Sequence, residues 1–218
     1  ETAVAYLARS LAQKHRHAVT VATGSASVEV DGVTYVPQTA INALLNSPWD
    51  IILVSRWREA LFSIEPDLDR IKRVIFWQHD IAYLAAMRDI YSRANALVQL
   101  TPWHAAVCQY PWPERRGLKE VVIPNGVDLS LFEGREERVP GRLIWTSNPN
   151  RGLPSAVRMF RKMRTKYPHM EFHIYGRASV YGWSPTAETM YLPAPDEPGV
   201  FVHEALPKRE LARELMKA

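Results

Sequence analysis

The segment from residue 144 to residue 153 combines residue types that suit diphosphate binding. Its sequence is IWTSNPNRGL, and it lies between a predicted strand and a predicted helix. The start of a helix offers unpaired N–H groups and a partial positive charge, Gly152 permits close backbone approach, and Arg151 adds a fork of donors for phosphate oxygens. The segment therefore predicts a pyrophosphate cradle. A capped turn with an arginine on the surface remains the alternative.

A second polar group follows a predicted strand in the first half of the chain. Residues 76–80 read FWQHD, and ligands of open α/β sheets bind at the carboxyl ends of strands. His79 suits a hydrogen bond to a sugar hydroxyl when its imidazole is neutral. The alternative is structural, with Asp80 capping a helix that begins at Ile81 and His79 serving only the fold.

The elements around these residues follow an α/β pattern over the first half of the chain. Short apolar runs alternate with segments of helical periodicity, which predicts a parallel sheet covered on both faces. Predicted strands cover 17–23, 51–54, 73–77, 96–100 and 120–123, and a hairpin covers 28–36 about Asp31-Gly32. Predicted helices cover 1–15, 41–45, 57–64, 81–93 and 103–109.

The apolar pattern lapses at 128–140, a charged stretch that we interpret as a linker. Beyond it the α/β pattern resumes. Predicted strands cover 142–146, 171–175 and 200–203, one helix covers 153–167 with its apolar stripe at Leu153, Val157, Phe160 and Met163, and Pro207 opens a last helix. We therefore predict two domains, 1–138 and 139–218. Three strands are fewer than a doubly wound domain usually has.

Two segments resemble signatures of family-four retaining glycosyltransferases. Residues 121–128 read VVIPNGVD with Phe132 after them; the turn residues alone indicate a strand exit, but in that family an I-P-N-G-V-D segment closes the N-terminal domain. The sequence SNPNRGL at 147–153 is similar to an S-S-P-D-R-G-L variant of the donor loop in a bacterial branch. The resemblance implies an α/β fold with two Rossmann-like domains of the GT-B type, the second incomplete.

The resemblance also implies site residues. His79 would be catalytic and point into the cleft, with Trp77 and Asp80 on the acceptor side. The donor-binding residues would be Ser147, Asn148, Arg151, Gly152, Gly176 and Arg177. Two departures bear on this set. Glu204-Ala205 stands where the family usually has a glycine near the nucleotide base, and no basic residue shortly precedes Arg151, for which Arg177 is the substitute.

The reaction implied by the resemblance is transfer of a sugar from a nucleoside-diphosphate donor to a glycan, lipid-linked or small-molecule acceptor, with retention of configuration. We expect no cofactor and no metal, because fixed donors at the start of the helix at Gly152 and the Arg151 guanidinium would stabilise the departing diphosphate.

Composition narrows the range of partners. The chain has 218 residues, 47% hydrophobic and 23% charged, with a net charge of +4, and no apolar run long enough to span a bilayer. We expect a cytoplasmic protein with no nucleic-acid partner and Cys108 as a small buried hydrophobe. The densest basic run comprises Arg158, Arg161, Lys162, Arg164 and Lys166. It fits a solvated helix face, or a peripheral contact with the inner face of an anionic membrane.

Other functions have weaker signals. Asp67-Leu68-Asp69 matches a metal-binding D-x-D pattern but does not follow a strand. No G-x-G-x-x-G opens a βα unit, which disfavours a nicotinamide-dependent oxidoreductase. A basic binding or scaffolding module is the non-enzymatic alternative and would show salt-dependent affinity for nucleic acid or lipid. Trp183 lies in a proline-rich segment that could close over the donor as a lid.

The two ends of the chain lead to a further expectation. Glu1 opens directly into a helix pattern, so we expect that an N-terminal strand is missing, and no pair of glutamates seven residues apart, which the family uses to hold the donor, follows Ala218. We therefore expect an inactive fragment whose incomplete sheet favours homo-oligomers.

Overall fold

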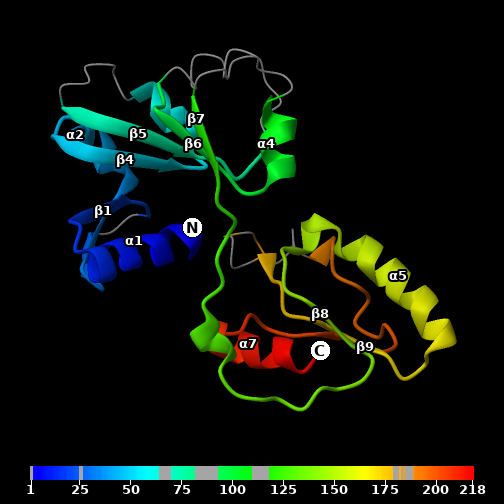
Figure 1. Ribbon diagram of the computed structural model, residues 1–218. Coiled ribbons are helices and arrows are strands. Elements are labelled where there is room, and N and C mark those ends of the chain that lie inside the picture. Colours follow the sequence, from blue (N-terminus) through cyan, green and yellow to red (C-terminus); the bar gives the residue numbers. More distant parts are fainter. Residues whose placement is uncertain are drawn as a thin grey trace. The chain divides into compact units, whose positions relative to one another are not determined.

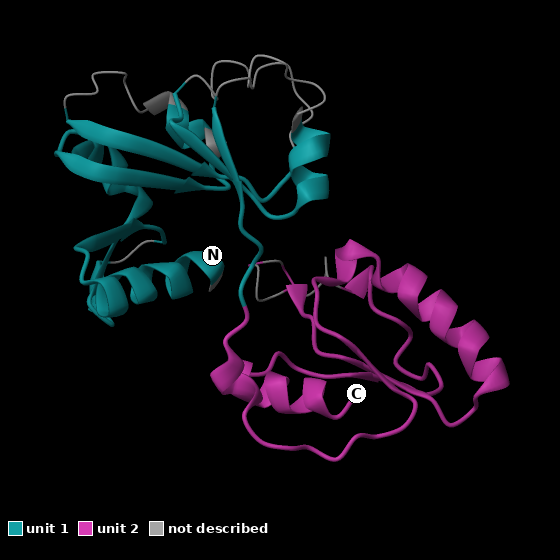
Figure 2. Ribbon diagram, in the orientation of Figure 1, with its two compact units in different colours: residues 1–126 teal, residues 127–218 magenta. Residues whose placement is uncertain are grey.

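The computed structural model describes residues 2–24, 27–63, 70–81, 93–109, 118–178, 182, 184 and 189–218. The chain divides into two compact units, residues 1–126 and 127–218 (Figure 2). The stretch from 127 to 138, which we assigned to the first domain, makes its contacts in the second unit: Arg138 donates to the carbonyl of Ala218 at 2.8 Å, and the neighbouring Val139 amide donates to Lys217.

The first unit contains the predicted alternation of helices and strands (Figure 1). Its elements are α1 (Thr2–His15), β1 (Val19–Ala22), β2 (Val28–Val30), β3 (Val33–Val36), α2 (Ile41–Leu45), β4 (Trp49–Ser55), β5 (Ile71–Trp77), β6 (Ala96–Gln99), α4 (Pro102–Gln109) and β7 (Lys119–Val122). Short 3₁₀ helices cover Gln38–Ala40 and Arg58–Ser63, the latter where we predicted an α-helix. Most of the helix predicted at 81–93 lies outside the described residues.

The strands of the first unit form two sheets. One is parallel, in the order β4-β5-β6-β7, and the other has the order β1-β3-β2, with β1 parallel and β2 antiparallel to β3. The hairpin prediction is confirmed: Asp31 (φ 55°) and Gly32 (φ 75°) both have the positive φ that a two-residue type I′ turn requires. The alternation of apolar runs with helical segments predicted the parallel pairing but not the separation into two sheets.

Apolar residues of β4, β5 and β6 form the core of the four-stranded sheet. Val74, Phe76 and Leu97 are almost fully buried, and Ile41 and Leu45 of α2 pack against this cluster. The parallel register pairs Ser55 with Trp77 and Trp77 with Val98. Because all four strands run the same way, the segments that follow β4, β5 and β6 leave from one edge of the sheet.

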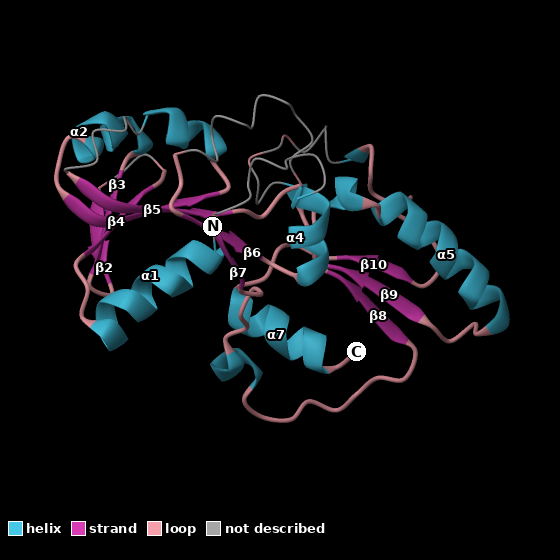
Figure 3. Cartoon of the chain, turned by 45° about the horizontal axis from the view of Figure 1, so that its top comes forward, coloured by secondary structure: helices cyan, strands magenta, loops and turns pink. Residues whose placement is uncertain are grey.

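The second unit has a parallel sheet in the order β10-β9-β8. Its elements are a 3₁₀ helix at Leu129–Phe132, β8 (Arg142–Trp145), a 3₁₀ helix at Pro149–Arg151, α5 (Leu153–Lys166), β9 (Glu171–Ile174), β10 (Val200–Val202) and α7 (Lys208–Met216) (Figures 1 and 3). These boundaries agree with the predicted strands and helices to within about two residues.

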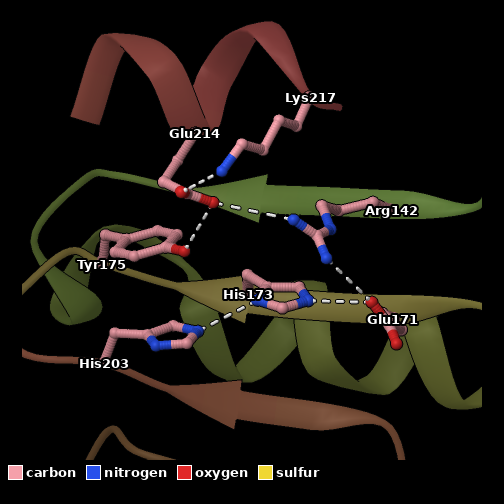
Figure 4. A network of polar contacts seen from close by, with 7 residues as sticks. All are labelled: Arg142, Glu171, His173, Tyr175, His203, Glu214 and Lys217. Atoms are coloured by element: carbon pink, nitrogen blue, oxygen red, sulfur yellow. Dashed lines mark hydrogen bonds and ion pairs between the residues drawn. The ribbon is translucent and has the colours of Figure 1, made fainter. Parts of the chain in front are cut away.

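The residues of β9 alternate between the two faces of this sheet. Phe172 and Ile174 pack with Phe160 of α5 in the apolar core. Successive side chains of a strand point to opposite faces, so His173 and its neighbours Glu171 and Tyr175 lie on the face away from α5, as Figure 4 shows.

A polar network occupies that second face (Figure 4). His173 uses both ring nitrogens: Nδ1 lies 2.9 Å from Nε2 of His203, and Nε2 lies 3.0 Å from Oε2 of Glu171. The His203 ring also stacks on Tyr175 with centroids 4.4 Å apart. In this contact one ring nitrogen donates and the other accepts.

Glu214 connects α7 to this network. Its carboxylate accepts from the Tyr175 hydroxyl at 3.1 Å and from Lys217 at 2.7 Å, and it lies 3.6 Å from Arg142 of β8. The Lys217 hydrogen bond lowers the pKa of Glu214, and burial together with Glu214 raises the pKa of Tyr175 to about 12. These contacts hold α7 against the sheet through one carboxylate.

We predict that Glu214→Gln lowers the free energy of unfolding by about 1 to 2 kcal/mol at neutral pH, because the amide keeps the shape but loses the charge that three partners contact. Glu210→Gln on the exposed side of α7 is the matched control. The folded-state pKa of Glu214 is depressed, so its contribution is present above the ordinary value of 4.5 and is lost as the pH falls through the folded value. Urea unfolding at neutral pH and near pH 4 should show the difference shrinking; a constant difference would contradict an ionic role.

Candidate functional site

The loop after β8 begins with a buried asparagine. Asn148 has 6% of its surface exposed, and its side-chain oxygen accepts from the amide of Asn150 at 3.3 Å. This Asn cap starts the 3₁₀ turn, whose first residue, Pro149, is also buried. Asn148, one of the predicted donor-binding residues, therefore supports the loop from inside.

Gly152 allows the loop to turn into α5. Its φ of 107° is a conformation that side chains disfavour, and a Cβ built on it would meet nothing within 4 Å. Its carbonyl accepts from the amides of Ser155 and Ala156 at 3.0 Å each. The glycine is therefore required by the backbone, and the space in front of it is open.

The 3₁₀ turn before α5 uses its backbone donors internally. The amide of Arg151 donates to Asn148, and that of Gly152 donates to Pro149. Pro154 has no N–H, which leaves Leu153 as the one amide in the first turn of α5 without a partner among the described residues. At the start of α5, the predicted group of free N–H donors is thus reduced to the amide of Leu153, beside the positive helix end and the side chain of Arg151.

The side chain of Arg151 is exposed and has no hydrogen-bond or ionic partner within the described part of the chain. Arg151 directly precedes Gly152, in the loop that follows the carboxyl end of β8. A guanidinium held at a helix start without an internal carboxylate can form a bidentate contact with an incoming phosphate.

Gly176 packs against the same loop. A Cβ at this position would lie 1.8 Å from the carbonyl oxygen of Ser147, a backbone atom. The amides of Tyr175 and Gly176 both donate to the carbonyl of Trp145, and the Trp145 indole donates to Ser147 at 2.8 Å. The structure therefore gives Gly176 a packing function, in which it lets the ends of β8 and β9 approach.

Arg177 turns toward the end of β10. Its guanidinium lies 3.4 Å from the carboxylate of Glu204 and 3.4 Å from the carbonyl of His203, and the side chain is mostly buried. Glu204 stands where the family that the sequence resembles usually has a glycine, and Arg177 is the substitute for that family's additional basic residue. The two positions at which the sequence departs from the family therefore contact each other.

In the first unit, the segment after β5 contains two buried polar atoms without partners. The ring of Trp77 is 7% exposed, and its centroid lies 4.6 Å from that of His79. Neither Nε1 of Trp77 nor Nε2 of His79 has a hydrogen-bond partner among the described residues. Buried polar atoms in proteins are nearly always paired, so these two are candidates for contact with a ligand.

His79 is held in its neutral form. Burial lowers its pKa below the ordinary value of 6.5, and the nearby Arg56 guanidinium lowers it further. A neutral imidazole can both donate and accept a hydrogen bond, which suits a sugar hydroxyl. In the folded state its protonation begins only below the pH at which an unperturbed histidine would titrate.

A buried network missed by the sequence analysis holds this segment. Gln78 donates to Cys108 at 3.3 Å and accepts from Gln99 at 3.1 Å. Nε2 of His104 lies 3.3 Å from the carbonyl oxygen of Asp80, and Nδ1 of the same ring accepts a hydrogen bond from the amide of Leu100. The polar residues at the ends of two neighbouring strands were visible in the sequence, but their pairing depends on the register of β5 and β6. Cys108 is buried, as predicted.

Asp80 forms an ion pair at the surface. Its carboxylate lies 3.3 Å from Arg56, which follows β4. The helix that it was expected to cap lies outside the described residues, as do Asp67, Asp69 and Trp183.

Other features of the described residues do not coincide with these segments. A hollow lined by Asp50, Lys72, Arg73 and Asn95 lies at the amino ends of the strands, opposite the edge that carries His79. No three His, Cys, Asp or Glu side chains in the described ranges could together hold a metal ion. Among the helices described, none has the length and apolar character needed to cross a membrane.

Comparison with solved structures identifies the fold. The trehalose-6-phosphate synthase OtsA aligns with a TM-score of 0.63 and 11% identity over 98% of this chain and 71% of its own. Anabaena Alr3699/HepE, solved with UDP and glucose, aligns with a TM-score of 0.59 and 12% identity over 97% and 68%. The pneumococcal O-GlcNAc transferase GtfA, solved with UDP and GlcNAc, aligns with a TM-score of 0.51 and 13% identity over 78% and 37%.

The chain therefore has a GT-B glycosyltransferase-like fold, in agreement with the predicted fold class. It spans only 37% of the length of GtfA and of TarM. No protein-family model and no curated protein matches the sequence. At identities of 11 to 14% the likeness establishes the fold.

We predict that Gly176→Ala lowers the free energy of unfolding by about 1 to 3 kcal/mol or more, because the new methyl must displace the backbone of Ser147. Gly126→Ala is the control, since a Cβ there meets nothing within 4 Å. Urea unfolding of both variants measures the difference. Equal stabilities would show that the β8–β9 contact is looser than the structure has it.

Proposed function

We propose that this chain forms part of a glycosyltransferase that takes a sugar from a nucleoside-diphosphate donor. The observation that supports this most strongly is the loop between β8 and α5, where Gly152 adopts a left-handed conformation and Arg151 extends without an internal partner. The GT-B fold adds support, since two of its neighbours were solved with UDP and a sugar.

In this proposal the leaving diphosphate binds at the start of α5. Its negative charge grows as the bond to the sugar breaks, and the Arg151 guanidinium together with the positive helix end stabilises that charge. The amide of Leu153 supplies a further donor. These groups are fixed before the reaction, so the mechanism requires no metal ion.

His79 would act on the sugar or on the acceptor. Its neutral ring can hydrogen-bond a hydroxyl, and the unpartnered Nε2 and the Trp77 indole N–H are the atoms that such a ligand would satisfy. The acceptor class we propose is a glycan, a lipid-linked sugar or a small molecule. Retention of configuration follows from the family resemblance.

The structure suggests different tasks for the other predicted donor residues. Asn148 caps the 3₁₀ turn of the loop, Gly176 packs against the backbone of Ser147, and Arg177 forms an ion pair with Glu204. Direct contact with the diphosphate is therefore proposed for Arg151, for Gly152 through its open backbone, and for Ser147, whose hydroxyl has no partner among the described residues.

We predict that Arg151→Ala weakens UDP binding by about 1.5 to 3 kcal/mol, the usual contribution of a charge-assisted hydrogen bond, or roughly tenfold to 150-fold in affinity. Lys162→Ala, about three turns farther along the chain in α5, removes the same charge as a control. Isothermal titration with UDP, after a thermal-shift screen of nucleotide sugars, provides the measurement. Unchanged affinity in the Arg151 variant would remove this residue from the site.

We predict that His79→Ala lowers the transfer rate roughly fivefold to 150-fold, the effect of losing one buried hydrogen bond, with a much smaller change in stability. The wild-type rate should fall as the pH drops below 6.5 and His79 becomes protonated, and the variant should lack this limb. Release of nucleoside diphosphate from donor sugars measures both. Parallel loss of folding and activity would instead show that His79 serves the fold.

A further inference from the structure

The outward side of α5 combines apolar and basic side chains. Met159 is 65% exposed, Met163 is 38% exposed and Tyr167, which follows the last turn, is 45% exposed. Met163 was predicted to belong to the buried stripe of this helix, but the core there consists of Leu153, Val157 and Phe160. Large apolar side chains exposed in one row of a helix mark a candidate contact surface, although the Tyr167 ring also lies 6.5 Å from that of His169.

The spacing aligns these residues in two adjacent rows. Met159, Met163 and Tyr167 follow one another every four residues, so they lie along one line of the helix. Arg158, Lys162 and Lys166 occupy the preceding position in each turn and form a parallel basic row. We call these six residues the outer face of α5.

The basic row differs from the other cations of the helix in its partners. Arg161 is held by Glu197, and Arg164 donates to the carbonyl of Met170. Arg158, by contrast, donates only to the hydroxyl of Ser155, and the ammonium of Lys166 lies 5.4 Å above the Tyr167 ring. No acidic residue occurs anywhere in α5, so nothing on this helix neutralises the row.

The two rows together fit one class of partner. A basic row alone would suit any polyanion, but a nucleic-acid backbone offers nothing to a neighbouring row of methionines. An anionic bilayer surface satisfies both, because lipid phosphates attract Lys and Arg while Met and Tyr lie at the boundary of the acyl chains. Fourteen residues make a helix of about 21 Å, so α5 would lie in the plane of the surface.

We propose that the outer face of α5 binds the surface of an anionic membrane. Met159, Met163 and Tyr167 enter the headgroup region, and Arg158, Lys162 and Lys166 contact lipid phosphates. This inference goes beyond the proposed function and does not rest on it. It places a lipid-binding surface on the side of the helix whose start we assign to the diphosphate.

The test is flotation of the purified full chain with vesicles of phosphatidylcholine alone or mixed with phosphatidylglycerol. We expect binding to the mixed vesicles and weak binding to phosphatidylcholine. The variant R158E/K162E/K166E should lose on the order of 100-fold in affinity, since each basic residue near an anionic surface contributes about fivefold. The variant M159S/M163S should lose about tenfold, because its charges remain while its apolar contact is gone.

The control variant is R135E/R209E/R213E, which changes the net charge by the same amount at exposed positions in the linker and on α7. It should bind the mixed vesicles like the wild type. The proposal is overturned if the wild type fails to float with anionic vesicles, if the control loses as much as the α5 variant, or if the serine variant binds normally. Binding of single-stranded RNA in place of vesicles would likewise overturn it. Titration with UDP tests the donor site separately, so the two proposals fail independently.

Discussion

Parallel pairing of short strands is the constraint from which the rest of this structure follows. A parallel strand must be reached by a crossover, and every crossover begins at the same edge of its sheet. The register of β4, β5 and β6 therefore places Arg56 beside the segment that contains His79, and the register of β8, β9 and β10 gathers Ser147, Gly176 and Glu204. Loops distant in sequence meet because the strands are aligned, and close approach at Gly176 is the consequence of that alignment.

The two candidate segments satisfy their polar groups in different ways. In the loop before α5, the amides of Asn150, Arg151 and Gly152 donate within the loop, and Arg151 is the residue that we propose to contact the ligand. After β5, the supporting residues Gln78 and His104 are hydrogen-bonded, while the outward atoms of Trp77 and His79 are not. Because the supporting residues are hydrogen-bonded within the protein, a few defined atoms remain for a ligand.

The sequence predicted element types well and side-chain partnerships poorly, for physical reasons. Residues 74–77 are all apolar and residues 171–174 alternate between polar and apolar side chains, two patterns typical of strands, and Pro154 with Pro168 bounds α5 on both sides. The pairing of Gln78 with Gln99 depends on strand register, and the contact of Gly176 with Ser147 depends on the crossover through α5 that aligns β8 with β9. Met163 fits the helical stripe by spacing, yet 38% of its surface is exposed. Such outcomes are set by tertiary geometry, which local patterns do not contain.

The distribution of carboxylates decides which cations of the second unit can meet an external anion. Glu197 holds Arg161, Glu204 holds Arg177, and Glu171 and Glu214 hold Arg142. Among the remaining cations, Arg151 lies directly before α5, and Arg158, Lys162 and Lys166 lie along the side of that helix. A diphosphate has no apolar part and suits the start, where the helix adds its positive end. A lipid surface is both anionic and apolar, and it suits the side of α5, where Met159 and Met163 lie beside the basic residues. In our two proposals, one helix thus presents two anion-binding surfaces of different chemistry, distinguished by the neighbours of each charge.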